Sequence, residues 1–283
     1  VELSSKSSAI STEQFQKVYQ QVQEKTPEHI QFYALAWSKI HTVACMSITS
    51  AFTFGFDEKY CAKGCKATAQ NPYFNVKSRA PFDDFKIRPT MMLAGSSIEQ
   101  VFVMIDRGVR SDGQRPDGMA YLLSTTDKNR NTRAQEYAPT IIALGEHVKI
   151  QQVNANTLKD KDDVMFYFTG MKQVEMIESN HFLDGAIADH LTSAGGVLFG
   201  NSQMSILRWL DAGATGSYGA VVEPCNFPQK FPHPGIAIEN YIQGNSLIEA
   251  YWKSVFWPGQ GLFVGEPLAS PYSKSVLTKV EIQ

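Results

Sequence analysis

The chain has 283 residues and a formal net charge of -2, with 43% hydrophobic and 19% charged residues. This composition is typical of a protein with a packed core and excludes an intrinsically disordered chain. Lysine and arginine are scattered along the sequence rather than clustered, so nucleic acid is not expected as a partner. No apolar run reaches the roughly 18 residues that a membrane-spanning helix needs, so we predict no transmembrane segment.

A single α/β domain over residues 1–283 is expected, because α/β proteins of this length often form around one sheet. The chain begins with Val1 rather than methionine. We therefore interpret it as a processed or truncated form, and its first residues do not indicate a compartment.

Residues 10–27 predict the first helix, because Ser11 and Gln14 have the spacing of a capping box. Residues 30–37 then predict a strand. Over residues 50–89, aromatic residues, glycines and prolines occur without a period. This stretch indicates a long irregular insertion within the domain.

Beyond residue 89, apolar strands alternate with amphipathic helices, which predicts an α/β fold with a mostly parallel sheet covered by helices on both faces. The first of these helices spans residues 98–109, where Val101, Ile105 and Val109 recur at helical spacing. The predicted strands are 119–125, 148–153, 163–170, 197–200, 217–224 and 261–267, and the further helices are 184–196, 203–213, 235–244 and 246–256.

A glycine-rich run over residues 213–235 also contains a glutamate, a cysteine and a histidine. Phosphate-binding loops follow a strand and open a helix, whereas Gly213, Gly216 and Gly219 follow a helix and precede a strand. The run is therefore not expected to bind phosphate. Gly213 is predicted to cap the C-terminus of the preceding helix.

Polar side chains follow several predicted strands, at the edge where open α/β sheets bind their ligands. The sequence therefore predicts a pocket at the carboxyl ends of the strands. Its expected residues are Asp127, Thr169, Asn201, Glu223 and Glu266, with Thr125, Ser202 and Cys225 beside them.

Two kinds of chemistry are open to these residues. Cys225 could act as a nucleophile with His233 as its base, or the carboxylates Asp127, Glu223 and Glu266 could act as acid and base. The structural alternative is that Glu223 and Glu266, each of which precedes a proline, end their strands in turns. We favour the structural interpretation, and we predict no cofactor.

The four cysteines are Cys45, Cys61, Cys65 and Cys225. Three residues separate Cys61 from Cys65, and this spacing alone allows a local disulfide, free thiols or two ligands of a zinc site. A zinc site would need two more ligands, and no second close pair of cysteine or histidine occurs. No metal site is therefore predicted.

Four segments closely resemble a family of exported Gram-negative bacterial proteins of unknown function: VACMSITSAFTFGFDEKYC, MAYLLSTTDKNRNTRA, GATGSYGAVVEPCNFPQKFPHPG and AYWKSVFWPGQGLFVGEPLASPY. The resemblance runs from about Phe32 to Tyr272. It implies export to the periplasm or the outer membrane, protein partners in the cell envelope and an oxidising compartment, where paired cysteines persist. On this basis we predict a disulfide between Cys61 and Cys65.

The order of predicted elements is also similar, at the level of fold, to that of the gingipain and caspase group of cysteine peptidases. In this resemblance the segments YFTG, VLFG and VGEP end three strands. Met171 and Lys172 stand where the peptidases have a histidine, and Gly200 and Asn201 stand where they have the nucleophilic cysteine. Because both catalytic groups are missing, the resemblance implies a caspase-like scaffold without peptidase activity.

We therefore expect a non-catalytic cell-envelope protein, a structural or accessory subunit of an assembly such as the outer-membrane complex of a type IV secretion system. It is expected to be an oligomer or a subunit of a complex. The aromatic segments NPYF and RAPFDDF of the insertion are expected to face a partner. The alternative is a hydrolase or a cysteine peptidase-like enzyme that uses the strand-end carboxylates with Cys225 and His233.

Overall fold

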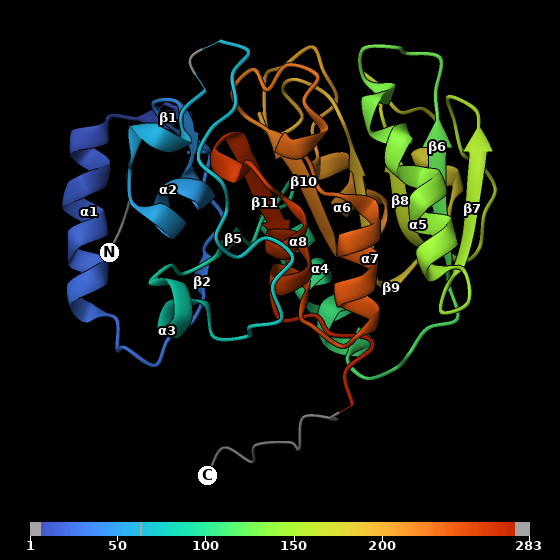
Figure 1. Ribbon diagram of the computed structural model, residues 1–283, viewed down its shortest axis with the longest axis horizontal. Helices are drawn as coiled ribbons and strands as arrows, with labels where there is room; N and C mark the ends of the chain where they lie inside the picture. Colours follow the sequence, from blue (N-terminus) through green and yellow to red (C-terminus); the bar gives the residue numbers. More distant parts are fainter. Residues whose placement is uncertain (1–6, 63, 275–283) are drawn as a thin grey trace.

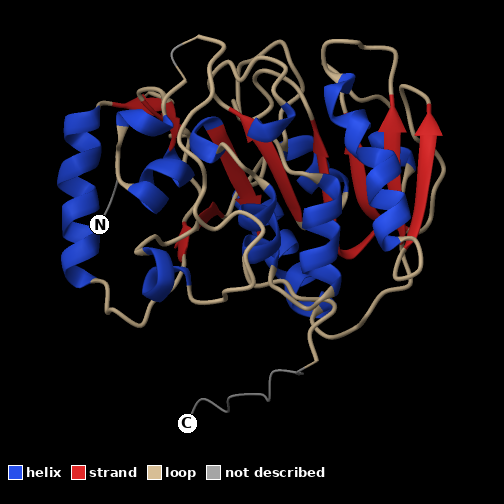
Figure 2. Ribbon diagram, viewed as in Figure 1, coloured by secondary structure: helices blue, strands red, loops and turns tan. Residues whose placement is uncertain are grey.

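The structure is a computed structural model that describes residues 7–62 and 64–274. Its centre is an eight-stranded sheet with flanking helices (Figures 1 and 2), which confirms the predicted α/β class. In spatial order the strands are β2 (Tyr33–Leu35), β5 (Thr90–Met92), β11 (Gly261–Gly265), β10 (Gly216–Ala220), β9 (Phe182–His190), β8 (Val164–Thr169), β6 (Met119–Ser124) and β7 (Lys149–Asn154).

All neighbouring strands of this sheet run parallel except β10 and β11, which pair antiparallel from Gly216↔Gly265 to Ala220↔Gly261. The sheet therefore consists of two parallel groups that point in opposite directions. A separate small sheet contains β1 (Ala9–Ile10), β3 (Thr42–Val43) and β4 (Met46–Ser47).

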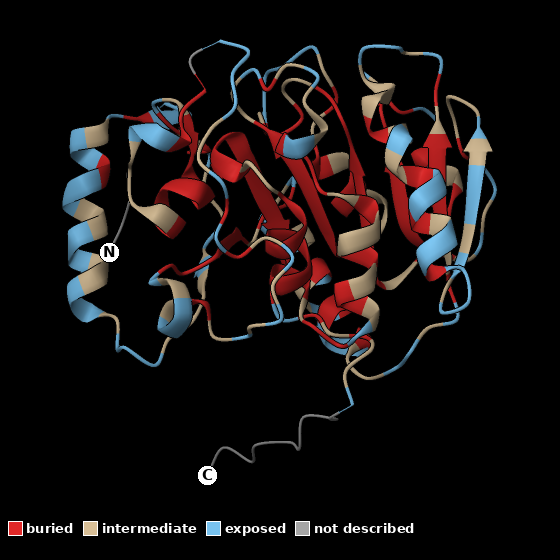
Figure 3. Cartoon of the chain, viewed as in Figure 1, coloured by how far each residue is buried: buried red, intermediate tan, exposed pale blue. Residues whose placement is uncertain are grey.

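Helices cover both faces of the large sheet. One layer contains α5 (Tyr137–Leu144), α7 (Pro234–Ile242) and α8 (Leu247–Ser254), which pack in sequence against one another in front of the sheet in Figure 1. The other contains α4 (Ile98–Ser111) and α6 (Leu207–Ala212), which contact each other and the strands β9 and β10. Figure 3 shows the central strands buried and the edge strand β7 exposed.

The N-terminal part and the insertion form the remaining helices: α1 (Thr12–Lys25), α2 (Ile48–Phe54) and α3 (Pro81–Phe85). The capping box of Ser11 and Gln14 is present at the start of α1, as predicted. Gly213 caps the C-terminus of α6 with φ 124°, as predicted from the order of elements. A positive φ of this kind is one that glycine adopts without steric cost.

Two predicted elements between residues 184 and 200 are wrong. The predicted helix over 184–196 is mostly strand β9, and the predicted strand over 197–200 is a loop. Ala186, Ile187 and Ala188 are buried between β8 and β10, and a strand buried on both faces lacks the polar alternation that marks half-exposed strands. The element order therefore differs here from the order that the peptidase resemblance implies.

Two of the four residues of the segment NPYF, Asn71 and Tyr73, are buried in the core. Asn71 donates its side-chain amide to the carbonyls of Trp252 and Val255, at 2.7 and 3.0 Å, and Tyr73 is fully buried. These contacts fix the insertion against α8. The other two residues keep surface accessible, since Pro72 is exposed and Phe74 is partly exposed.

The end of β9 carries a fully buried histidine. His190 Nδ1 accepts a hydrogen bond from the Trp209 indole at 3.0 Å, so the ring proton is on Nε2, which donates to the Met204 carbonyl at 3.1 Å. Protonation of Nδ1 would place a donor against the indole N–H. Burial lowers the pKa of His190 to about 3.

This buried ring predicts acid sensitivity. Because the folded-state pKa of His190 lies below the roughly 6.5 of an unfolded chain, the unfolded state takes up the proton first as the pH falls. The stability that neutral His190 contributes is therefore complete above about pH 6.5 and is lost as the pH falls toward the folded-state pKa. Between pH 7 and pH 5, wild type should lose about 2 kcal/mol more unfolding free energy than His190→Gln, whose amide can both accept and donate.

Urea unfolding of both proteins at the two pH values measures this difference. The other buried titratable groups, including His41 and Asp189, are common to both proteins, so the comparison isolates His190. An equal pH dependence in the two proteins would contradict the assignment.

Candidate functional site

The residues of the predicted strand-end pocket are divided between the two opposite ends of the strands. Asp127, Thr169, Asn201 and Glu223 follow or end strands of the parallel group β6, β8, β9 and β10, and lie at one edge. Glu266 follows β11, which runs antiparallel to β10, and its backbone N–H donates to the carbonyl of Thr215 at the start of β10. Glu266 therefore lies beside the start of β10, at the opposite end of the strands, and is not part of the pocket.

Glu266 is largely buried against α4, where a Cβ added to Gly108 would come within 2.7 Å of its carboxylate oxygen. Burial raises the pKa of this carboxyl group. Its Oε1 accepts the backbone N–H of Leu268 at 3.1 Å. Glu266 thus ends β11 in a turn, as the structural interpretation predicts.

The other strand-end residues form polar contacts within their own loops or with a neighbouring loop. Asp127 forms an ion pair with Arg130 at 2.8 Å, and Thr125 donates to the carbonyl of Gly170 at 2.8 Å. Asn201 donates to the carbonyl of Ala194 at 3.0 Å. These groups hold the loops after β6, β8 and β9 in place.

Glu223 also has a local structural role. Its Oε1 accepts the backbone N–H of Cys225 at 2.7 Å, and its own carbonyl accepts the side-chain amide of Gln260 at 2.7 Å. The residue ends the segment after β10 in a hydrogen-bonded turn. The turn before Pro224 matches the structural interpretation of this glutamate.

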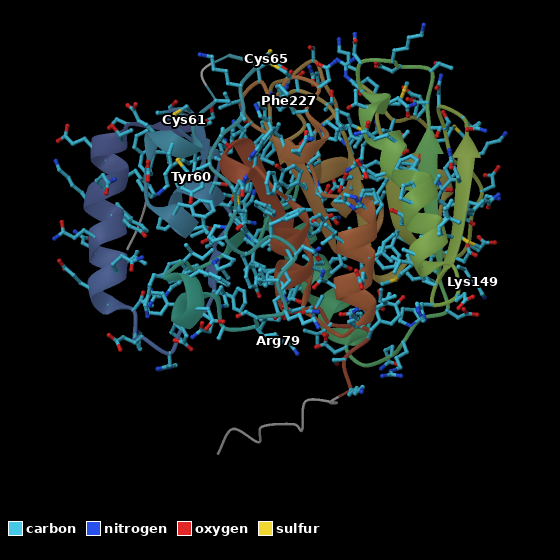
Figure 4. All side chains as sticks on the ribbon, in the orientation of Figure 1. Tyr60, Cys61, Cys65, Arg79, Lys149 and Phe227 are labelled. Carbon is cyan, nitrogen blue, oxygen red and sulfur yellow. A yellow bond between two sulfur atoms is a disulfide. The ribbon has the colours of Figure 1, made fainter. Side chains whose placement is uncertain are left out.

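The predicted disulfide between Cys61 and Cys65 is wrong. Cys61 pairs with Cys45, with their Cα atoms 5.3 Å apart, and Cys65 pairs with Cys225, with their Cα atoms 5.6 Å apart. Figure 4 shows Cys61 and Cys65 well apart, because the turn at Gly64 carries the chain from the β4 side toward the loop after β10. With its sulfur bonded to Cys65, Cys225 supplies no thiolate.

His233 has a structural position at the start of α7. Its Nδ1 accepts the backbone N–H of Ile236 at 3.4 Å, and its Nε2 lies 3.0 Å from Glu136 Oε2. Both ring nitrogens are thus engaged, with the proton on Nε2 directed at the carboxylate. The predicted pair of Cys225 and His233 is not formed.

Sequence reasoning missed the buried ion pair at this edge, Arg133 with Asp189. Both side chains are almost fully buried, and Arg133 also donates to the carbonyl of Thr169 at 2.9 Å and to that of Pro232 at 3.3 Å. Burial raises the pKa of Asp189 to about 6, against the opposing effect of the guanidinium. The pair connects the segment before α5, strands β8 and β9, and the entry to α7.

A small cleft of about 260 Å³ lies above this pair. Its walls are largely aromatic, and its polar side chains are those of Arg133, Glu136, Gln229, His233 and Ser254. The lining residues are Phe74, Arg133, Glu136, Pro228, Gln229, Phe231, His233, Ser254 and Phe256. Because three phenylalanines and a proline line it, the cleft offers mainly apolar contact.

Neither a metal cluster nor a membrane-spanning helix is found in the described part of the chain. Among residues 7–62 and 64–274, no three His, Cys, Asp or Glu side chains are placed to hold a metal ion. No helix in these ranges is long and apolar enough to cross a bilayer.

Helix α4 presents an exposed apolar stripe. Ile98, Phe102 and Val109 are 46%, 60% and 63% exposed, and with the partly buried Ile105 they fall on one side of the helix. Val101 and Met104 occupy the side that faces the sheet. The helix has therefore two apolar sides, of which the structure covers one.

Comparison with protein-family models, curated proteins and solved structures found no match to this chain.

The two disulfides predict unequal effects on stability. In the chain-entropy model the long Cys65–Cys225 loop, with a sequence separation of 160, contributes about 5 kcal/mol, and the loop between Cys45 and Cys61, with a separation of 16, contributes about 3 kcal/mol. The double substitution of Cys65 and Cys225 by alanine should therefore lower the melting temperature more than that of Cys45 and Cys61. Peptide mapping of the unreduced protein checks the pairing, and a cross-link between Cys61 and Cys65 would contradict it.

The buried ion pair predicts a second inequality. Asp189→Ala leaves the Arg133 guanidinium without its carboxylate and should cost about 3–5 kcal/mol of unfolding free energy. Replacing both residues, Arg133→Met with Asp189→Leu, removes both charges and should cost less. Urea unfolding of the two variants measures the difference, and a double variant at least as unstable as Asp189→Ala would oppose this account.

Proposed function

We propose that this chain is a non-catalytic subunit of a cell-envelope assembly that contacts a partner protein through the exposed stripe of α4. The observation that carries the proposal is the stripe itself, three large apolar side chains that are each about half exposed or more. Contiguous apolar surface of this kind marks interaction sites in folded proteins. We infer a location in the periplasm or at the outer membrane, and the assembly could be an outer-membrane secretion complex.

The two disulfides are compatible with an exported protein, since disulfides persist in oxidising compartments. The roles of the strand-end residues also favour binding over the catalytic alternative. Cys225 is bonded to Cys65, and His233 caps a helix. In this proposal the residues at the strand ends stabilise the fold, and the exposed stripe of α4 contacts the partner.

The flanks of the stripe indicate the chemistry of the partner. Glu99 and Asp106 are exposed, seven residues apart, and lie along one border of the apolar side chains. A complementary surface would carry apolar residues beside basic ones. We therefore propose a partner helix with an apolar stripe bordered by lysine or arginine.

A charge placed in the stripe should abolish this contact without unfolding the protein. Phe102→Glu changes a side chain that is 60% exposed, so the melting temperature should shift little. Loss of one buried phenylalanine contact is worth about 2 kcal/mol, or roughly thirtyfold in affinity. The matched control is Ile142→Glu, which changes an 85% exposed residue of α5 on the other layer.

Quantitative pull-down from detergent-solubilised envelope compares the three proteins, and light scattering gives their oligomeric state. We expect an envelope partner that wild type and Ile142→Glu retain and Phe102→Glu loses. If all three proteins are monomers that recover the same envelope proteins in equal amounts, the proposed role of α4 is wrong.

A further inference from the structure

Strand β2 forms an open edge of the large sheet. It is the terminal strand in the sheet order, and in the described residues it pairs with β5 alone. The Tyr33 N–H donates to the Pro89 carbonyl at 3.0 Å, and the Leu35 carbonyl accepts the Leu93 N–H at 2.9 Å. Because backbone groups alternate in direction along a strand, the N–H and C=O of Ala34 point away from β5.

A groove runs along this open edge. Its volume is about 520 Å³, and it lies between β2 and the helices α1 and α2. Val18 and Val22 of α1 and Ile48 and Phe52 of α2 form apolar walls, and Ala34, an exposed residue of β2, also lines the groove. The groove therefore combines unpaired backbone groups with apolar surface for side chains.

One end of the groove is lined by a lysine. Lys25 is the charged residue in its lining, it is exposed, and it forms no ion pair with the residues that the structure describes. It lies beside the start of β2, where the Tyr33 hydroxyl donates to the side chain of Thr26 at 3.1 Å. The electrostatic complement of the Lys25 ammonium group is an anion such as a chain-terminal carboxylate.

We propose that the carboxyl-terminal segment of a partner protein binds here as an added strand. The segment lies antiparallel to β2, exchanges backbone hydrogen bonds with Ala34 and places alternate apolar side chains between α1 and α2. Its terminal carboxylate meets Lys25. Strand addition of this kind takes its affinity from backbone hydrogen bonds and its specificity from the pockets for alternate side chains.

The shape of the edge favours a slim peptide over a second copy of the chain. Because α1 forms one wall of the groove and lies on the outer side of β2 in Figure 1, it leaves less room for the sheet of a second copy than for a single peptide strand. The inference concerns a different surface from α4 and uses different variants. Its failure is therefore distinguishable from failure of the proposed function.

The test uses a displayed pool of random-sequence peptides with free carboxyl termini, selected on the folded protein. Ala34→Pro removes the outward N–H of the edge strand, whereas Ala34→Val, the matched control, keeps it. We expect selected peptides to carry apolar residues at alternate positions, to bind Ala34→Val like wild type, and to lose about tenfold or more in affinity on Ala34→Pro.

Two further measurements test the carboxylate, and they do not depend on the folding of Ala34→Pro. Amidation of the peptide terminus, or Lys25→Glu on the exposed end of α1, should each weaken binding by about threefold or more. The proposal is overturned if no peptide is enriched, or if amidated and free peptides bind wild type and Lys25→Glu equally well. A concentration-dependent dimer of wild type that Ala34→Pro abolishes would assign the edge to a second copy and would also overturn it.

Discussion

The antiparallel pairing of β10 with β11 determines which of the residues that follow the strands can lie close together. Five strands have their carboxyl ends on one side of the sheet and three have theirs on the opposite side. Polar residues that each follow an apolar strand in the sequence can therefore be separated by the length of a strand. Glu223 and Glu266 both follow an apolar strand and precede a proline, yet they lie at opposite ends of the paired strands β10 and β11. A shared site for these carboxylates is excluded by strand direction alone.

At the carboxyl ends of the five parallel strands, most of the polar groups bond to other parts of the fold. The buried pair of Arg133 and Asp189 ties β8 and β9 to the segments that lead into α5 and α7, and the cleft above it has mainly apolar walls. Cys225 and Glu223 fix the loop after β10. The two surfaces that we propose for partners lie elsewhere, on the apolar side of α4 and along the open edge of β2.

Local signals in the sequence predicted local structure well. The capping box of α1, the buried strand β8 and the helix cap at Gly213 each depend on neighbouring residues, and the structure contains them. Prediction failed where the outcome depends on distant segments. Four cysteines allow three pairings, and nothing near Cys65 indicates a partner 160 positions away. Similarly, the residues of β11 carry no sign that the strand runs against β10, and α4 has two apolar sides of which the sequence alone does not identify the buried one.

The central claim is that the protein acts by contact through α4 rather than by chemistry at its strand ends. The most direct test places a photo-reactive amino acid at Phe102 and, in a separate protein, at Ile142, and irradiates cells that make each protein. The account predicts one discrete protein adduct from position 102 and none from the more exposed position 142. Equal adducts from both positions, or no adduct from position 102, would contradict it.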